Sequence, residues 1–310
     1  MVATRQEGTT VKPLSDGTAF VEGAYVPIGE ARLPLLDWGF TRSDVTYDVV
    51  HVWKGSFFRL DDHLDRFQRS CDRLRLNPGY GRDQTREILM RCVSLSGLRE
   101  AYVEMICTRG VPAPGSRDPR LCRNQFFAFA IPFVWIFSRS RQKEGAHLII
   151  SDVPRIAPVS VDPTVKNFHW GDLTRALFQA LDRGGDSAVL LDGDGYLSEG
   201  PGFNVFRVHQ GGVTTPEGTV LEGITRASVR ELCEELDIPF ALTRITPDEL
   251  RDADEVFVSS TAGGVMPVSR VDQRILGNGR PGPVTLRIRE LYWRKHEQGW
   301  HATPVDYESP

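Results

Sequence analysis

The strongest restriction on the fold is a change of pattern near residue 137. Phe126–Phe137 is the most apolar run of the chain, but it is too short to span a bilayer and contains Pro132. It therefore predicts a buried strand that runs into a connector. The polar stretch Ser138–Gly145 follows and has the composition of an interdomain linker. We expect a smaller domain over residues 1–137 and a larger one over residues 146–310.

The two parts carry different patterns. Before the linker, short strands come first and helices follow, with hairpins expected at 19–26 and 47–59 and helices at about 61–76 and 84–96. A strand at 101–109 and a loop at 111–123 complete this part. After the linker, strands and helices alternate from residue 147 to about residue 296. The chain is expected to be a mixed α/β protein of two domains, in the α+β sense.

Composition excludes several classes of protein. The net charge is −4 and arginines are interspersed with carboxylates, so no positive field attracts nucleic acid. Met1–Gly8 lacks the apolar stretch of a secretion signal, and we expect no membrane segment. The five cysteines are odd in number and show no CxxC spacing. Reduced thiols in a cytoplasm are the expected state, and no metal site is expected.

Lys166 is the first candidate for chemistry. The chain has 37 Lys and Arg residues, of which only five are lysines. Arginine stays protonated, whereas a desolvated lysine can lose its proton and attack a carbonyl to form a Schiff base. Lys166 lies between a Pro-containing approach and an aromatic stretch, in Asp162–Leu173. Taken alone, a surface lysine is the simpler interpretation.

Three loop-bound features and one arginine accompany it. Glu199 lies among glycines, Thr225 is expected to open a helix, and the small residues of 259–265 follow a strand. Helix starts and Gly-rich turns offer backbone N–H groups that can hold a phosphate, and Arg66 could supply the cation. Each also has an ordinary interpretation: a turn carboxylate, an N-cap, tight packing, or the solvated end of a helix. No role is assigned to His63.

Together these features resemble the class IV aminotransferases, the fold-type IV pyridoxal-phosphate enzymes that include D-amino-acid and branched-chain aminotransferases. The general signature is HLDR at 63–66, Lys-Asn at 166–167, SEGPGFN at 198–204, GITR at 223–226 and STAGG at 260–264. Longer strings are similar to (R)-selective amine transaminases: LPLLDWGFTRSDVTYDV (33–49), FFRLDDHLDR (57–66), DPTVKNFHWGDLTR (162–175), GPGFNVF (200–206) and PVDY (304–307).

The resemblance implies pyridoxal 5′-phosphate as cofactor. Lys166 would bind it covalently and, once displaced, move the proton between substrate and cofactor. Glu199 would pair with the pyridine nitrogen and keep the ring an electron sink. The expected cofactor-binding residues are Arg66, Lys166, Glu199, Phe203, Asn204, Ile224, Thr225 and Thr261, with a backbone N–H near Ala262 also directed at the phosphate.

The substrate pocket follows by the same analogy. It would be lined by Tyr47, Val49, Tyr102, Glu104, Trp170 and Ala262. The pairs 47/49 and 102/104 lie at strand spacing i, i+2, so each pair shares a face. An acidic residue at Glu104 disfavours the α-carboxylate of an amino acid, although it could equally be a solvent-facing residue paired with an arginine.

Two departures from the family concern the carboxylate of a keto acid. Arg42 stands where better-known members have His, and the loop Gly110–Arg117 is one residue shorter and lacks their arginine. Arg42, then Arg117, are the candidates to bind this carboxylate, since a planar guanidinium suits bidentate binding.

The leading hypothesis is a transaminase that moves an amino group from an (R)-configured primary amine to a keto acid such as pyruvate. A D-amino-acid or branched-chain aminotransferase, an aminodeoxychorismate-lyase-like enzyme and a cofactor-less binding protein are the alternatives. The resemblance also implies a homodimer, with the active site at the subunit and domain interface.

Overall fold

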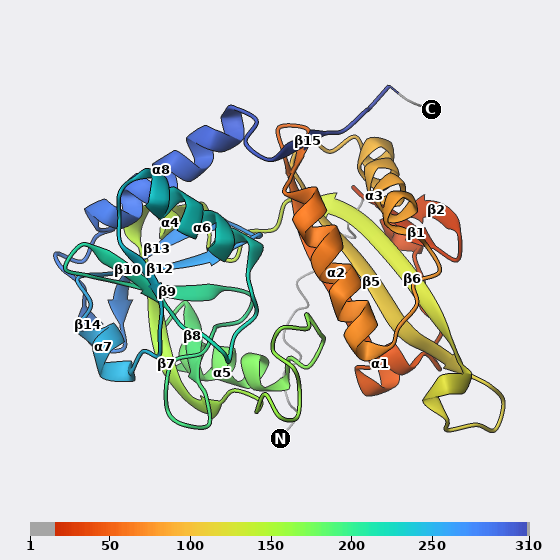
Figure 1. Cartoon of the computed structure of the whole chain (residues 1–310), viewed down its shortest axis with the longest axis horizontal. Coiled ribbons are helices and arrows are strands. Elements are labelled where there is room, and N and C mark those ends of the chain that lie inside the picture. The colour runs from red at the N-terminus through yellow and green to blue at the C-terminus, as the bar shows by residue number, and fades with distance from the viewer. Residues whose placement is uncertain (1–15, 309–310) are drawn as a thin grey trace, which may run out of the picture.

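The computed structural model describes residues 16–308, so the expectation for Met1–Gly8 lies outside the described residues. The chain forms two sheets, each covered by its own helices, and the two lobes lie side by side (Figure 1). This confirms the expected mixed α/β fold in two parts.

The first sheet has the strand order β15-β4-β3-β5-β6-β1-β2, and all of its pairings are antiparallel. Its long central strands are rich in β-branched and aromatic residues, which favour strands. The members are β1 (Thr18–Val21), β2 (Ala24–Pro27), β3 (Val45–Trp53), β4 (Ser56–Phe58), β5 (Ala101–Pro112), β6 (Cys122–Pro132) and β15 (Ala302–Pro304).

Two long helices, α2 (Leu60–Leu74) and α3 (Arg82–Ser96), pack on this sheet, while α1 (Trp38–Arg42) precedes β3. In α2, Leu64, Phe67 and Cys71 recur at helical spacing and are buried in the lobe's core. The helix begins at Leu60, one residue before the start predicted from the sequence. Short 3-10 turns occur at Ile28–Glu30 and Pro119–Leu121.

The second sheet has the order β11-β10-β9-β12-β13-β7-β8 and mixes parallel with antiparallel pairs. Its strands are β7 (Ala146–Pro154), β8 (Ser187–Leu191), β9 (Asn204–His209), β10 (Gly212–Thr215), β11 (Phe240–Leu242), β12 (Glu255–Ser260) and β13 (Gly264–Val271), with β14 (Arg274–Ile275) beside β13. The helices are α4 (Arg139–Glu144), α5 (Gly171–Asp182), α6 (Ile224–Glu235), α7 (Pro247–Arg251) and α8 (Pro283–Glu297).

The three long helices of the second lobe cover one face of its sheet, and Leu250 of α7 packs into the apolar cluster on the other face. α5 packs against β7 and β8, whereas α6 and α8 pack against β12 and β13 and against each other. Separate apolar clusters lie on the two sides, one around Leu148 and Val258 and another around Phe206 and Leu232. The sheet is therefore buried on both faces, as the apolar character of its strands requires.

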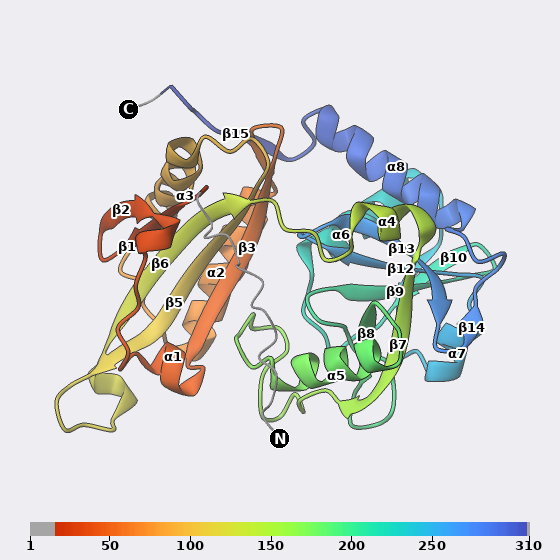
Figure 2. The ribbon, with the colours of Figure 1, turned by 180° about the vertical axis from the view of Figure 1, so that it is seen from behind.

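The connection between the lobes differs from the expected flexible linker. β6 ends at Pro132, residues 133–137 cross to the second lobe, and Arg139–Glu144 form helix α4 (Figure 2). The Ser138 side chain accepts a hydrogen bond from the Arg141 N–H and so caps this helix, and Gln142 is buried. Polar composition alone did not reveal this cap.

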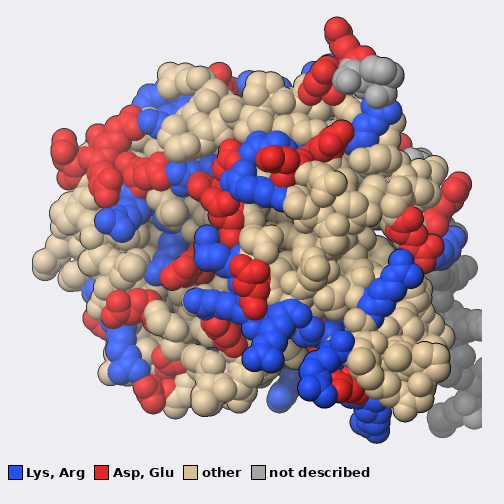
Figure 3. Space-filling model, turned by 45° about the vertical axis from the view of Figure 1, so that its right-hand side comes forward, with Lys and Arg blue, Asp and Glu red and all other residues tan. Residues whose placement is uncertain are grey.

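The last residues of the proposed second domain, 146–310, lie on the first lobe. Ala302–Pro304 return to the first lobe as β15 and pair with β4, and Val305 joins that lobe's core. We propose that these residues belong to the smaller domain. No helix within residues 16–308 is long and apolar enough to cross a membrane. Acidic and basic side chains are interspersed over much of the face shown in Figure 3.

Candidate active site

A cavity of about 500 Å³ lies between the two lobes. Strands β3 and β5 line it from the first lobe. The second lobe contributes the connection from β7 to α5, the segment before β9, the start of α6 and the turn after β12. Apart from β3 and β5, these are loops, turns and a helix start held in place by the two sheets, which is the usual position of a binding site.

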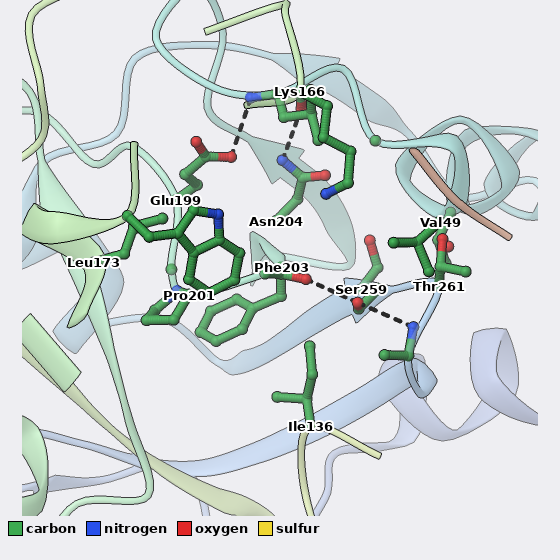
Figure 4. Close-up of a pocket in the computed structure, with 18 of the residues that line it drawn as sticks. Val49, Ile136, Lys166, Leu173, Glu199, Pro201, Phe203, Asn204, Ser259 and Thr261 are labelled. Atoms are coloured by element: carbon green, nitrogen blue, oxygen red, sulfur yellow. Dashed lines mark hydrogen bonds between the residues drawn. The ribbon is translucent and has the colours of Figure 1, made fainter. Parts of the chain in front are cut away.

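Lys166 lies in the connection from β7 to α5, but β3 of the other lobe fixes its backbone. Its carbonyl oxygen accepts hydrogen bonds from Thr46 Oγ1 at 2.7 Å and from the Tyr47 N–H at 3.2 Å. The Lys166 ammonium lies 4.4 Å from the centre of the Tyr47 ring. The side chain points into the cavity (Figure 4). The cavity therefore holds an amine that is tied to both lobes.

Glu199 lines the same cavity as Lys166 and is buried, with 7% of the residue exposed. Its Oε2 accepts the Leu221 N–H at 3.0 Å, and its Oε1 accepts Arg155 Nη2 at 3.2 Å (Figure 4 shows the first contact). Burial raises the pKa of Glu199, while the Arg155 guanidinium opposes this rise. The site thus presents a buried carboxyl group with a guanidinium beside it.

The start of α6 forms another wall. Ile224, not Thr225 as expected, begins this helix after Gly223, and no side chain caps its first N–H groups. A Cβ at residue 223 would lie 2.1 Å from Asn204 Oδ1, so only glycine fits there. Asn204 in turn donates to the Leu221 carbonyl at 3.0 Å. An uncapped helix start is suited to an anion.

The turn after β12 faces this helix start. Ser259 Oγ is buried and has no hydrogen-bond partner among residues 16–308. Thr261 and Ala262 also line the cavity, and Ser260 Oγ ties the turn to the Gly202 carbonyl at 2.8 Å. A buried hydroxyl without a partner is costly unless a ligand satisfies it. These donors fit the phosphate of a cofactor.

Arg66 adds a cation to this end of the cavity. It projects from α2 and is only 4% exposed. Its Nε donates to Asp48 Oδ2 at 2.7 Å and its Nη2 to Asp48 Oδ1 at 2.8 Å. Its Nη1 donates to the Glu222 carbonyl at 3.1 Å, directly before the start of α6. Arg66 thus links the first lobe to the anion-binding end of the second.

The remaining wall consists of substrate-pocket candidates. Val49 pairs with Glu104, and His51 with Tyr102, in the register of β3 and β5. The Tyr102 hydroxyl donates to Glu104 Oε2 at 3.1 Å, and Glu104 is 8% exposed. Burial raises the pKa of Glu104 to about 7, with the Lys166 charge opposing this. Of the predicted pocket residues, Tyr47, Val49, Tyr102, Trp170 and Ala262 line the cavity, whereas Glu104 lies behind Tyr102 and is not a lining residue.

Arg42 and Arg117 do not line the cavity of the chain that carries them. Arg42 ends α1, is exposed, and stacks its guanidinium 3.5 Å from the Trp38 ring centre. Arg117 is exposed in the loop between β5 and β6. Their expected contact with a substrate carboxylate stays a prediction.

Three residues of the site were not predicted from the sequence. Arg155 bridges Glu199 and Asp172, Asp48 holds Arg66, and Ser259 offers a buried hydroxyl. Arg155 and Asp48 act through contacts between segments distant in sequence, and such contacts leave no local pattern. Within residues 16–308 no cluster of three or more His, Cys, Asp or Glu side chains is arranged to hold a metal ion.

Comparisons with known proteins agree with this geometry. Residues 46–271 match the family "Amino-transferase class IV". A putative branched-chain-amino-acid aminotransferase of Methanocaldococcus jannaschii is 30% identical over 276 residues, which cover 88% of this chain and 94% of the relative. A D-alanine aminotransferase of Bacillus licheniformis is 28% identical over 275 residues, 86% of this chain and 93% of the relative.

Solved structures show the same fold. The branched-chain amino acid aminotransferase of T.th., complexed with N-(5′-phosphopyridoxyl)-L-glutamate, superposes with a TM-score of 0.86 at 31% identity over 94% of this chain and 100% of that one. The branched-chain enzyme of Escherichia coli gives 0.88 at 25% identity with the same coverage. The cavity, its amine and its anion-binding end therefore belong to a class IV aminotransferase, an enzyme that uses pyridoxal 5′-phosphate.

Proposed function

We propose that this aminotransferase is an (R)-selective amine transaminase, which transfers an amino group from a primary amine to a keto acid such as pyruvate. The observation that carries the proposal is Glu104, a buried carboxyl hydrogen-bonded to the cavity-lining Tyr102 at 3.1 Å. Above its pKa of about 7 it is an anion. A negative charge behind this wall opposes a donor that carries its own carboxylate and leaves a neutral aryl or alkyl group unaffected.

The positive charges of the cavity support this proposal. Among the described lining residues the arginines are Arg66, which we assign to the cofactor phosphate, and Arg155, which binds Glu199 and Asp172. Lys166 is the remaining cation, and its amine is needed for the reaction itself. No lining arginine is therefore left to bind an amino acid's α-carboxylate in the way a bidentate guanidinium does.

Lys166 and Glu199 are proposed to act on the reacting atoms. When bound, pyridoxal 5′-phosphate supplies an electron sink for the carbanion formed on loss of a proton. Lys166 Nζ would hold the cofactor covalently and, when free, take the proton from the substrate carbon and return it. Glu199 would accept a hydrogen bond from the pyridine nitrogen, and the Arg155 guanidinium partly offsets the rise that burial causes in the pKa of Glu199.

The other cofactor-binding residues divide into two groups. Arg66, Thr225, Thr261 and the N–H groups near Ile224 and Ala262 surround the end of the cavity that we assign to the phosphate, because a dianion is stabilised by a guanidinium and by a helix start. Phe203 and Asn204 lie at the ring end near Glu199 (Figure 4). Trp170, Tyr47 and Val49 remain for the substrate.

The acceptor's carboxylate is assigned to Arg42 or Arg117 of a neighbouring subunit in a homodimer. Neither side chain lines its own cavity, and Arg42 lies beside exposed apolar residues. Leu35, Leu36 and Phe40 are 73%, 68% and 64% exposed, which is the composition of an interface. The cytoplasm remains the proposed location, and the described cysteines are all free thiols.

A branched-chain or D-amino-acid aminotransferase is the second candidate, because the similar proteins carry these names. A donor panel separates the candidates, with pyruvate as acceptor and 2-oxoglutarate as acceptor in a parallel series. The proposal predicts the highest kcat/KM with (R)-1-phenylethylamine, at least about a hundredfold above its (S)-enantiomer. A preference for L-leucine or D-alanine over both amines would contradict it.

A further inference from the structure

Asp48 is the most completely buried carboxylate near the cavity. It lies on β3 between the two pocket candidates Tyr47 and Val49, and its side chain is 0% exposed. Its Oδ2 accepts Arg66 Nε at 2.7 Å. Its Oδ1 accepts Arg66 Nη2, His63 Nδ1 and the Val49 N–H, each at 2.8 Å. Both oxygens of Asp48 are therefore used within the protein, and neither is available for a ligand.

Arg66 is held by Asp48 along one edge and by a backbone carbonyl at Nη1. The bidentate contact with Asp48 uses Nε–H and one N–H of Nη2, and the Glu222 carbonyl takes one N–H of Nη1. Each terminal nitrogen carries two N–H groups, so one N–H on Nη1 and one on Nη2 remain. Such a pair of donors in one plane is the group that binds a phosphate bidentately.

His63 completes the arrangement from α2, one turn before Arg66. Its ring is 1% exposed. The charged and titratable groups that act on it are Asp48, Arg66 and Asp62. Burial lowers the pKa of His63, so the ring is neutral at neutral pH and its Nδ1–H donates to Asp48 Oδ1. A neutral donor orients the carboxylate without competing with Arg66 for its charge.

A contribution to folding does not account for this cluster. A buried ion pair adds little net stability, because the desolvation of both partners offsets their attraction. A fixed guanidinium, by contrast, loses little freedom when it binds a ligand. The arrangement is therefore costly unless a ligand uses it.

We propose that Asp48 and His63 are positioning residues for phosphate recognition: Asp48 clamps one edge of Arg66, His63 orients Asp48, and the free edge of Arg66 then meets the cofactor phosphate. This inference rests on the proposed role of Arg66, and it does not depend on which amine is the donor.

The test compares the binding of pyridoxal 5′-phosphate and of pyridoxal, which lacks the phosphate, to apoenzyme, by absorbance and fluorescence titration. In Asp48→Asn an N–H donor replaces one of the accepting oxygens and faces Arg66 or His63. We expect pyridoxal 5′-phosphate to bind about tenfold to a hundredfold more weakly, and pyridoxal to change by less than about threefold. Equal weakening of both ligands would show a general structural role and overturn the proposal.

Three further variants keep the test decisive if Asp48→Asn does not fold. His63→Asn retains a donor near the Nδ1 position and His63→Leu removes it, so only the second should lower the phosphate preference. Asp65→Asn is the matched control, because Asp65 precedes Arg66 but forms an exposed pair with Arg82. Its phosphate preference should equal that of the parent enzyme, and a loss as large as in Asp48→Asn would overturn the proposal.

Arg66→Gln tests the role of Arg66 separately from the positioning roles of Asp48 and His63. If it leaves the phosphate preference unchanged, the role of Arg66 and the positioning proposal both fail. If it removes the preference while Asp48→Asn and His63→Leu keep it, the positioning proposal alone fails. The donor panel tests which amine is the substrate, and its result does not depend on any of these variants.

Discussion

Lys166 is proposed to have two roles, because the same amine would hold the cofactor and carry a proton. Lys166→Ala should lower transaminase turnover by about 10³-fold or more, and Lys166→Arg should do the same because a guanidinium keeps its proton. Single-turnover assays with (R)-1-phenylethylamine measure the effect. Borohydride should fix label on Lys166 in the parent enzyme only. Full turnover by Lys166→Ala would exclude the assignment.

Glu104 leads to a prediction about how the preference between donors changes with pH. Its pKa of about 7 means that it is protonated below this pH and anionic above it. Repulsion of a donor carboxylate therefore grows as pH rises, so the ratio of kcat/KM for D-alanine to that for (R)-1-phenylethylamine should fall between about pH 6 and pH 8. Glu104→Gln has no charge to gain, and it should flatten this ratio and raise it about tenfold at pH 8. A pH-independent ratio in the parent enzyme would contradict the role of Glu104.

The residues differ in how far the sequence reveals them. Lys166, Glu199 and Arg66 stand in short strings with a characteristic order, so their types and neighbours indicate the chemistry. Asp48 lies in one of these strings, yet nothing local shows that it faces Arg66, 18 residues away. Arg155 meets Glu199 only after β7 and β8 have paired. Contacts between segments that are distant in sequence cannot be predicted from residue types alone.

At the scale of elements, β3 and α8 meet through two histidines, of which His51 is buried and His296 is half-buried. His51 and His296 stack with ring centres 5.4 Å apart, and their Nε2 atoms are 3.3 Å apart. His296 Nδ1 donates to the Tyr292 carbonyl at 2.8 Å, so its Nε2 is the acceptor and His51 Nε2–H the donor. A proton on His296 would place two N–H groups against each other across the lobes.

Acid should therefore weaken this contact. Burial lowers the pKa of His296 to about 4 and also lowers that of His51. The unfolded chain takes up protons near pH 6.5 and the folded chain does not, so stability falls as pH drops from about 6.5 towards 4, by up to about 1.4 kcal/mol per pH unit for each histidine. Urea unfolding at pH 7.5 and 5 measures this. His296→Phe should reduce the loss, while the exposed His209→Ala should not; equal losses in all three chains would refute the assignment.

Elements with strong periodicity were the easiest to predict. The apolar face of α2 and the long strands β3 and β5 follow their patterns, and their ends differ from expectation by a few residues. α4 and β15 were missed for separate reasons. α4 is a short polar helix stabilised by its Ser138 cap and by packing on β13, and β15 is a strand of three residues that exists only because β4 offers it an edge.

For the whole molecule, the decisive question is its assembly. If the exposed Leu35, Leu36 and Phe40 form the proposed subunit interface, Leu36→Glu should place a charge in it and shift sedimentation from two subunits to one. Activity with pyruvate should fall together with the mass. Ile275→Glu, at a position 60% exposed on β14, is the control and should remain associated. A Leu36→Glu protein with the mass of the parent would place the interface elsewhere.

The strand β15 has a consequence for synthesis. The first sheet begins with residue 18, but its edge at β4 is covered only when Ala302–Pro304 leave the ribosome, after the entire second lobe has been made. Domains generally fold in the order of synthesis, so the first lobe must wait with an open strand edge of the kind that pairs with other nascent chains. Rare codons or bound chaperones near the end of translation would then affect the yield of the first lobe as much as that of the last helix.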